Sequence, residues 1–289
     1  MEHEPVEPAP RPPDYVMDLM ARAAAMNEQD PCLHGRLLEL PPAGELMVTG
    51  DLHGNLSNFR RITRIADLGH HPQRHILLQE LLHAMYADTP DRSYQLLEEA
   101  AIYKTVYPGQ VHFLLGNHDI AELYGLEIMK QGRSVLSVFN TALQEAYQFN
   151  ADVIRKAYNR FLRSLPWAAV TAHGVLLCHS LPDGKYVHLF DRALFTRASR
   201  EADIGRDSPA FRMAWGRDIA RPTSAAFAER MEVDLILCGH HPCQRGYTTP
   251  NPHLVVIDSK DAHGAYALLP LDRKLTQQDV VSRIKFLNF

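Results

Sequence analysis

Gly50-Asp51-Leu52-His53-Gly54-Asn55 and Gly116-Asn117-His118-Asp119 are the two stretches that decide how this chain is interpreted. Each directly follows an apolar run typical of a β-strand, residues 46–49 and 111–115. An Asp-x-His pair after one strand and an Asn-His pair after another bring together carboxylate, imidazole and amide donors. Such donors can hold two divalent cations a few ångströms apart, and a cation pair can clamp a phosphate group. The sequence therefore predicts a metal centre built on strand ends.

Two further histidines also follow apolar runs. His179 comes after residues 175–178, and His240 follows residues 235–238 through Gly239. A single histidine after a strand is usually an ordinary surface or core residue. Ligand-type residues after four separate strands are not expected by chance, and rigid strands hold ligands well while loops admit substrate. The ligands expected from this pattern are Asp51, His53, Asn117, His179 and His240.

Length and composition indicate an α/β protein. The 289 residues, 46% of them hydrophobic, are enough for one large domain or two small ones. A net charge of -4 argues against a nucleic-acid partner held by phosphate contacts, although it allows small phosphorylated substrates. The start of the chain lacks a signal-peptide pattern, and no apolar stretch approaches the roughly 18 residues of a membrane span. We expect a soluble protein without a membrane partner.

The four cysteines are scattered along the chain. Cys178 and Cys238 lie inside apolar strand-like runs, where a thiol behaves as a small hydrophobic group. This usage favours a reducing, cytoplasmic location without disulfides.

The chain is organised as a proline-rich start followed by alternating elements. Residues 1–14 are expected to be a disordered tail because five of the first 13 residues are prolines, and residues 15–289 are expected to form a single domain. The predicted strands are 46–49, 75–79, 110–115, 167–171, 175–178, 235–238, 254–258 and 265–269. The predicted helices are 15–26, 56–68, 91–106, 120–130, 134–165 in two pieces, and 225–231. This order predicts two packed sheets covered by helices.

These motifs resemble those of the calcineurin-like metallophosphoesterases, and within them the branch of serine/threonine protein phosphatases and symmetrical dinucleoside tetraphosphatases. The matching segments are Gly50–Asn55, Tyr103–Pro108 leading to Gly116–Asp119, Leu165–Val170 leading to Cys178-His179, and Cys238-Gly239-His240 with Gly246-Tyr247. The resemblance implies an α/β fold, an αββα four-layer sandwich of two mixed β-sheets flanked by helices. It also implies hydrolysis of phosphate esters by a hydroxide that bridges two metal ions.

The chain departs from the family pattern after its second strand. Relatives carry Gly-Asp-x-x-Asp-Arg-Gly there, and the first Asp bridges both metals, whereas this chain runs Gln79-Glu80-Leu81-Leu82-His83. We favour the register that places Glu80 on the bridging ligand and His83 on the second Asp. The alternative register, Asp88-Thr89-Pro90-Asp91-Arg92-Ser93, stays open.

The resemblance also assigns catalytic roles. His118 is expected to donate a proton to the leaving oxygen, with His83 within its reach in place of the aspartate that relatives pair with this histidine. A neutral His83 should leave the pKa of His118 less elevated, which favours acidic phenolic leaving groups over alkyl alcohols. Arg92 and Arg217 are the expected phosphate-binding residues, although Arg217 could instead form a surface ion pair with Asp218.

The expected cofactors are two divalent metal ions, Mn²⁺, Fe or Zn²⁺, because the donors are oxygen and imidazole without thiolate. The expected partner is a phosphorylated substrate, either a phosphoprotein or a small phosphoester. Two alternatives remain. The first is hydrolysis of a dinucleoside polyphosphate or another nucleotide. The second is a catalytically degenerate metal-binding interaction module, suggested by the altered segment at residues 79–83.

Overall fold

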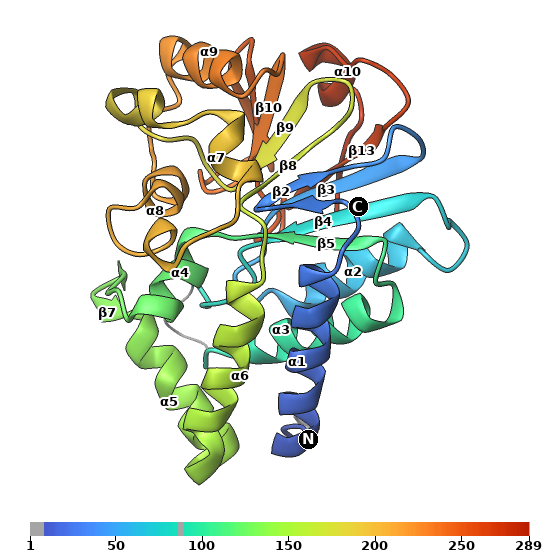
Figure 1. Cartoon of the computed structure of the whole chain (residues 1–289). Helices are drawn as coiled ribbons and strands as arrows, with labels where there is room; N and C mark the ends of the chain where they lie inside the picture. The colour runs from blue at the N-terminus through green and yellow to red at the C-terminus, as the bar shows by residue number, and fades with distance from the viewer. Residues whose placement is uncertain (1–8, 86–89, 289) are drawn as a thin grey trace.

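A computed structural model of the chain describes residues 9–85 and 90–288. Two β-sheets lie face to face within this part, and helices cover their outer sides (Figure 1). Both sheets contain parallel and antiparallel strand pairs. The predicted four-layer αββα sandwich is therefore confirmed.

The smaller sheet carries the first predicted motif. It consists of β3 (Glu45–Asp51), β4 (Arg74–Gln79), β5 (Val111–Leu114), β13 (Ala265–Pro270) and β14 (Ile284–Phe286), in the order β14-β13-β3-β4-β5. Strands β3, β4 and β5 are parallel, whereas β13 is antiparallel to β3. Because parallel strands end at the same edge of a sheet, residues at or just after their ends are brought to one place, among them Asp51, Glu80 and Asn117.

The larger sheet brings in the two later histidines. It consists of β1 (Leu33–His34), β2 (Leu37–Glu39), β8 (Ala168–Val170), β9 (Val175–Cys178), β10 (Leu235–Cys238), β12 (Leu254–Ile257) and β11 (Tyr247–Asn251), in that order across the sheet. Strands β9 and β10 are parallel, so His179 and His240 follow them at one edge. A separate two-stranded hairpin is formed by β6 (Met129–Lys130) and β7 (Arg133–Ser134).

Alternating side chains fill the space between the two sheets. Val48 and Leu77 of the smaller sheet belong to the same buried cluster as Leu177 and Leu237 of the larger one. Their neighbours in sequence point to the opposite faces and pack against helices, because successive residues of a strand alternate between faces. The strands are thus fixed on both sides, which gives the ligand-bearing ends a rigid base.

Helices cover the outer faces of both sheets. They are α1 (Pro13–Glu28), α2 (Leu56–Ala66), α3 (Ser93–Val106), α4 (Asn117–Tyr124), α5 (Val135–Tyr147), α6 (Ala151–Arg163), α7 (Arg192–Thr196), α8 (Pro209–Ala214), α9 (Arg221–Arg230) and α10 (Gln277–Val281). Helices α1, α2 and α3 lie on one side of the sandwich and α9 on the other (Figure 1). Short 3-10 turns occupy Gln148–Asn150, Gly184–Leu189 and Glu201–Asp203.

Two sequence predictions need correction. The helix expected at residues 120–130 is α4, which starts three residues earlier and ends where Gly125 adopts a left-handed conformation (φ 63°) that stops the helix. Met129–Lys130 is instead the strand β6. The expected tail 1–14 is also too long, because α1 begins with Pro13 at a position that favours proline. The first eight residues of that tail lie outside the described part of the chain.

The four cysteines are all free thiols. None of the helices in residues 9–85 and 90–288 is long and apolar enough to cross a lipid bilayer.

Candidate metal centre

The imidazole of His179 lies at the centre of a buried group of ligand-type atoms. Its Nε2 is 2.8 Å from Glu80 Oε2, 2.9 Å from Asn117 Oδ1 and 3.1 Å from His240 Nδ1. We call these four residues the His179 cluster. It joins the ends of β4, β9 and β10 with the first turn of α4. The strand-end pattern predicted Asn117, His179 and His240, and the family resemblance predicted Glu80.

Hydrogen bonding fixes the orientation of the His179 ring. Its Nδ1 is 2.9 Å from Gln79 Oε1, and the Gln79 amide is itself fixed because its Nε2 donates to the carbonyl of Thr49. Gln79 therefore accepts the Nδ1 proton, and the Nε2 lone pair points into the cluster. A single ring proton could not satisfy three electron-rich neighbours in any case. Donor atoms on one cation at about 2.1 Å lie about 3.0–3.4 Å apart, close to the spacing found here.

Among the residues that the structure describes, two buried atoms of the cluster, Glu80 Oε2 and His240 Nε2, have no hydrogen-bond partner. Buried polar atoms normally have a partner, so such atoms call for an explanation. Within the described part of the chain, one group of three acid or imidazole residues has all its ligand atoms within 4.8 Å of one another. It consists of Glu80, His179 and His240. The donor set fits a divalent cation.

Asp51 and His53 lie beside the cluster and could serve a second cation together with Glu80. Asp51 Oδ2 is 3.7 Å from His53 Nε2. His53 Nδ1 lies 3.3 Å from the carbonyl of Leu82, which leaves Nε2 as the ring atom that faces Asp51. Asp51 Oδ1 accepts the backbone N–H of His240, which connects this pair to the His179 cluster.

The backbone at the site adopts an unusual conformation. His53, Glu80, His83 and His240 all have positive φ, between 42° and 64°. This region is costly for residues other than glycine, and residues held in it concentrate at functional sites. The surrounding structure therefore forces these side chains toward one point at the expense of local stability.

Burial and neighbouring charges act in opposite directions on the pKa values of Asp51 and His179. Burial alone would raise the pKa of Asp51, but the rings of His53 and His179 hold it below its usual range. Burial alone would lower the pKa of His179, but Glu80 and Asp51 raise it. Carboxylates thus favour positive charge in their neighbours, which is the electrostatic condition for binding cations.

His118 lies at the edge of the His179 cluster, where its backbone N–H donates to Glu80 Oε1 at 3.0 Å. Its Nδ1 is 3.1 Å from Nδ1 of His83. Burial, followed by the neighbouring His53 and His83 rings, holds the pKa of His118 well below its usual range. This direction agrees with the expectation that His118 lacks a directly paired carboxylate.

Arg217 lies next to the cluster and not in a surface ion pair with Asp218. Its Nη1 donates to the carbonyl of His240 at 3.0 Å, whereas Asp218 accepts from Thr223 and from backbone N–H groups. Burial lowers the pKa of Arg217, and the charges of Asp51 and Glu80 oppose that effect. Arg217 therefore places a cation beside the two acidic ligands.

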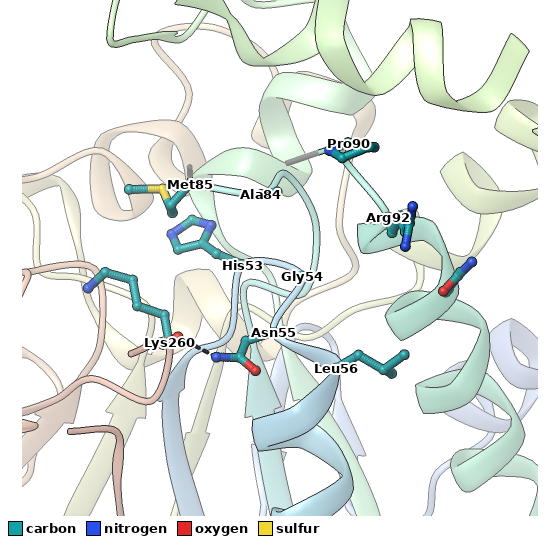
Figure 2. Close-up of a pocket in the computed structure, with 10 residues that line it drawn as sticks. His53, Gly54, Asn55, Leu56, Ala84, Met85, Pro90, Arg92 and Lys260 are labelled. Atoms are coloured by element: carbon teal, nitrogen blue, oxygen red, sulfur yellow. Dashed lines mark hydrogen bonds between the residues drawn. The ribbon is translucent and has the colours of Figure 1, made fainter. Parts of the chain in front are cut away.

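Arg92 lines a cavity of about 400 Å³ that opens beside His53 (Figure 2). The other walls include Leu56, Met85 and Pro90, and Lys260 lies across from Arg92. The cavity is therefore partly apolar and carries cations on opposite sides.

The alternative register would use Asp88 and Asp91 as the acidic residues. Asp88 lies outside the described residues, but Asp91 accepts hydrogen bonds from the backbone N–H groups of Ala84 and Ser93. Asp91 thus holds the loop together and is not part of the His179 cluster. Glu80 is the carboxylate that lies among the other ligands.

Sequence reasoning missed three side chains of the site: Gln79, Glu122 and Lys130. Glu122 follows His118 by four residues on one helix, a spacing that places both on one face of α4 but does not indicate the contact of Glu122 with His83. Lys130 adds positive charge near Glu80 and Asp51 from the β6–β7 hairpin. No sequence signal pointed to Gln79, because its role depends on the orientation of its amide.

Comparisons with known proteins agree with this geometry. Residues 45–244 match the model of the calcineurin-like phosphoesterase family. A protein of Encephalitozoon cuniculi (strain GB-M1), named as a probable serine/threonine-protein phosphatase, is 21% identical over 228 residues. That match covers 71% of this chain and 44% of the relative, so the chain spans less than half of the relative's length.

Solved structures share the fold. A serine/threonine phosphatase from Saccharomyces cerevisiae, described as similar to a human phosphatase, has a TM-score of 0.67 at 16% identity, covering 89% of this chain and 82% of that one. A cold-active protein-tyrosine phosphatase from a Shewanella species has a TM-score of 0.56 at 14% identity, covering 85% and 80%. The family match extends over more than half of the chain and includes the ligand-bearing strand ends. The chain belongs to the calcineurin-like phosphoesterase family.

Proposed function

We propose that the chain is a dinuclear-metal-dependent phosphomonoesterase of the protein phosphatase type. The observation that carries the proposal is the His179 cluster, in which electron-rich atoms lie 2.8 to 3.1 Å from one ring nitrogen. Glu80, Asn117, His179 and His240 would hold one cation. Asp51, His53 and Glu80 would hold the other, with Glu80 shared between the two.

When bound, the two cations would activate water as the nucleophile and would neutralise charge on the phosphate. Arg217 would bind a phosphate oxygen, since its guanidinium already lies beside the ligands, and Arg92 would contact the substrate from the cavity wall. His118 would donate a proton to the leaving oxygen as the phosphorus–oxygen bond breaks.

The test is hydrolysis by the purified chain after removal of metal with a chelator and addition of Mn²⁺, Fe²⁺ or Zn²⁺. Phosphoserine, phosphothreonine and phosphotyrosine peptides, p-nitrophenyl phosphate and diadenosine tetraphosphate are the substrates to compare. We expect metal-dependent release of phosphate from the monoesters, and a loss of at least about 100-fold in Asn117→Ala.

Two outcomes would contradict the proposal. Faster hydrolysis of diadenosine tetraphosphate than of any monoester would assign the site to nucleotides. Failure to hydrolyse any ester, with fewer than two cations bound per chain, would favour a binding module.

A further inference from the structure

A buried carboxylate lies behind the pair of histidines at the edge of the metal centre. Glu122 Oε2 is 3.4 Å from Nε2 of His83, whose Nδ1 is 3.1 Å from Nδ1 of His118. The side chains of His83 and Glu122 are 0% and 2% exposed. The three residues therefore form a line that runs from the interior to the metal centre.

The local sequence explains how this line forms. His118 and Glu122 are one turn apart on α4 and so share one face of that helix. His83 reaches them from the loop after β4, where its backbone N–H donates to Ser93 Oγ at 2.9 Å. Its ring packs edge-on against Phe139, with the ring centroids 5.1 Å apart. The backbone of His83 is thus held by Ser93 and its ring by Phe139.

We propose that Glu122 is a positioning residue for hydrolysis, which fixes the tautomer of His83 and through it the orientation of His118. This inference rests on the proposed phosphoesterase function. It goes beyond the family pattern, which places a carboxylate directly beside the histidine that His118 matches.

The position of one proton decides the tautomer of His83. Between the two Nδ1 atoms of His83 and His118 only one hydrogen can sit. If His83 carried it, the bare Nε2 of His83 would face the Glu122 carboxylate, lone pair against lone pair. If His83 carries its proton on Nε2, that N–H donates to Glu122, and Nδ1 accepts from His118. An ionised Glu122 therefore selects the second arrangement, in which Nδ1–H of His118 donates to His83. The proton given to the leaving oxygen is then the one on Nε2 of the cationic His118 ring, which ends as the neutral form protonated on Nδ1.

The environment of Glu122 argues against a role in stability. Its Oε1 is buried without a hydrogen-bond partner among the residues that the structure describes. Glu98, in contrast, accepts from Tyr147, Tyr158 and Arg11. Burial of a carboxylate with so few donors opposes folding. Glu122 is thus explained better by what it does to His83 than by packing.

The first experiment compares leaving groups in Glu122→Gln. Glutamine keeps the shape of the Glu122 side chain, but its amide can also donate a hydrogen bond to His83 Nε2. His83 is then no longer restricted to one tautomer. We expect kcat/KM to fall about 10- to 100-fold for alkyl phosphates, whose leaving oxygen needs a proton, and by less than about threefold for p-nitrophenyl phosphate. Glu122→Asp, which retains a carboxylate, should recover part of the loss.

The second experiment repeats the Glu122→Gln substitution in a protein that already carries His118→Ala. If Glu122 acts through His118, adding Glu122→Gln to His118→Ala should have no further effect, because the two changes remove one function. An equal loss for alkyl and aryl esters, or additive losses in the double variant, would assign Glu122 a merely structural role and overturn the proposal.

Imidazole nitrogen NMR of the metal-free protein supplies a readout that does not depend on activity. At mildly alkaline pH we expect neutral His83 to be protonated on Nε2 in the natural sequence and to lose that preference in Glu122→Gln. A wild-type His83 protonated on Nδ1 would overturn the proposal. If the chain hydrolysed no ester, the proposed function would fail, whereas the NMR result would still decide the tautomer.

Discussion

Gly116→Ala tests whether Glu80 must lie where the structure places it. A Cβ atom on Gly116 would be 2.7 Å from Glu80 Oε1 and 2.8 Å from its Oε2 and Cδ, whereas ordinary contact begins at 3.4 Å. The backbone of Gly116 is extended (φ -103°, ψ 176°), so alanine fits the conformation and only the clash matters. The Glu80 carboxylate has to move by about 0.6 to 0.7 Å, away from atoms that hold it on the other side.

The shift should weaken metal binding more than it weakens the fold. Displacing a supporting group typically costs 10- to 100-fold in metal affinity, and a misplacement near 1 Å can cost about 100-fold in rate. Overpacking should lower the free energy of unfolding by about 1–3 kcal/mol. The measurement is metal content per chain by elemental analysis, followed by Mn²⁺ titration and thermal unfolding.

Gly109→Ala is the matched control, because the added Cβ has no atom of the described residues within 4 Å apart from those of its chain neighbours. It should bind metal with wild-type affinity. If Gly116→Ala also binds two cations with unchanged affinity, Glu80 is not the shared ligand and the reasoning is refuted.

Further predictions concern the phosphate site, the core and pH. Arg217→Ala should raise KM and the inhibition constant of inorganic phosphate about 10- to 100-fold, because it removes a charge-assisted hydrogen bond; unchanged inhibition would exclude phosphate contact. Tyr158→Phe should lower the free energy of unfolding in urea by about 1.5–3 kcal/mol, because the Tyr158 hydroxyl donates to the buried Glu98 carboxylate at 2.6 Å. Burial, and then the neighbouring His112, lower the pKa of His75 from 6.5 to about 4. The stability from neutral His75 is therefore complete above pH 6.5 and is lost as the pH falls toward 4, by about 1–2 kcal/mol after allowance for partial exposure. His75→Gln should flatten that part of the stability profile, and an unchanged slope would contradict this assignment.

The sequence predicted the fold class well because its strand signals are strong. Apolar runs followed by Gly-Asp, Gly-Asn or Gly-His mark β3, β5 and β10. Helices between β3, β4 and β5, and between β9 and β10, agree with the parallel pairing of these strands within their two sheets. The αββα fold and the phosphoesterase family are both confirmed. The short strands β1, β2 and β14 were missed because strands of two or three residues carry no periodicity.

The candidate site was predictable as a set of residues but not as a network. Asp51, Asn117, His179 and His240 stood out because each follows a strand, and the structure brings them together. Their catalytic and metal-binding roles stay predictions. Glu122 escaped notice because its importance depends on the ring of His83, which comes from a segment 39 residues away. Contacts of that kind depend on tertiary packing, which no local pattern records.

A crystal structure of the manganese-loaded protein, with anomalous scattering measured for Mn, tests the central claim most directly. We expect two anomalous peaks, both within bonding distance of the Glu80 carboxylate, one beside Asn117, His179 and His240 and the other beside Asp51 and His53. A single peak, or two peaks of which neither contacts Glu80, would contradict the proposed metal centre.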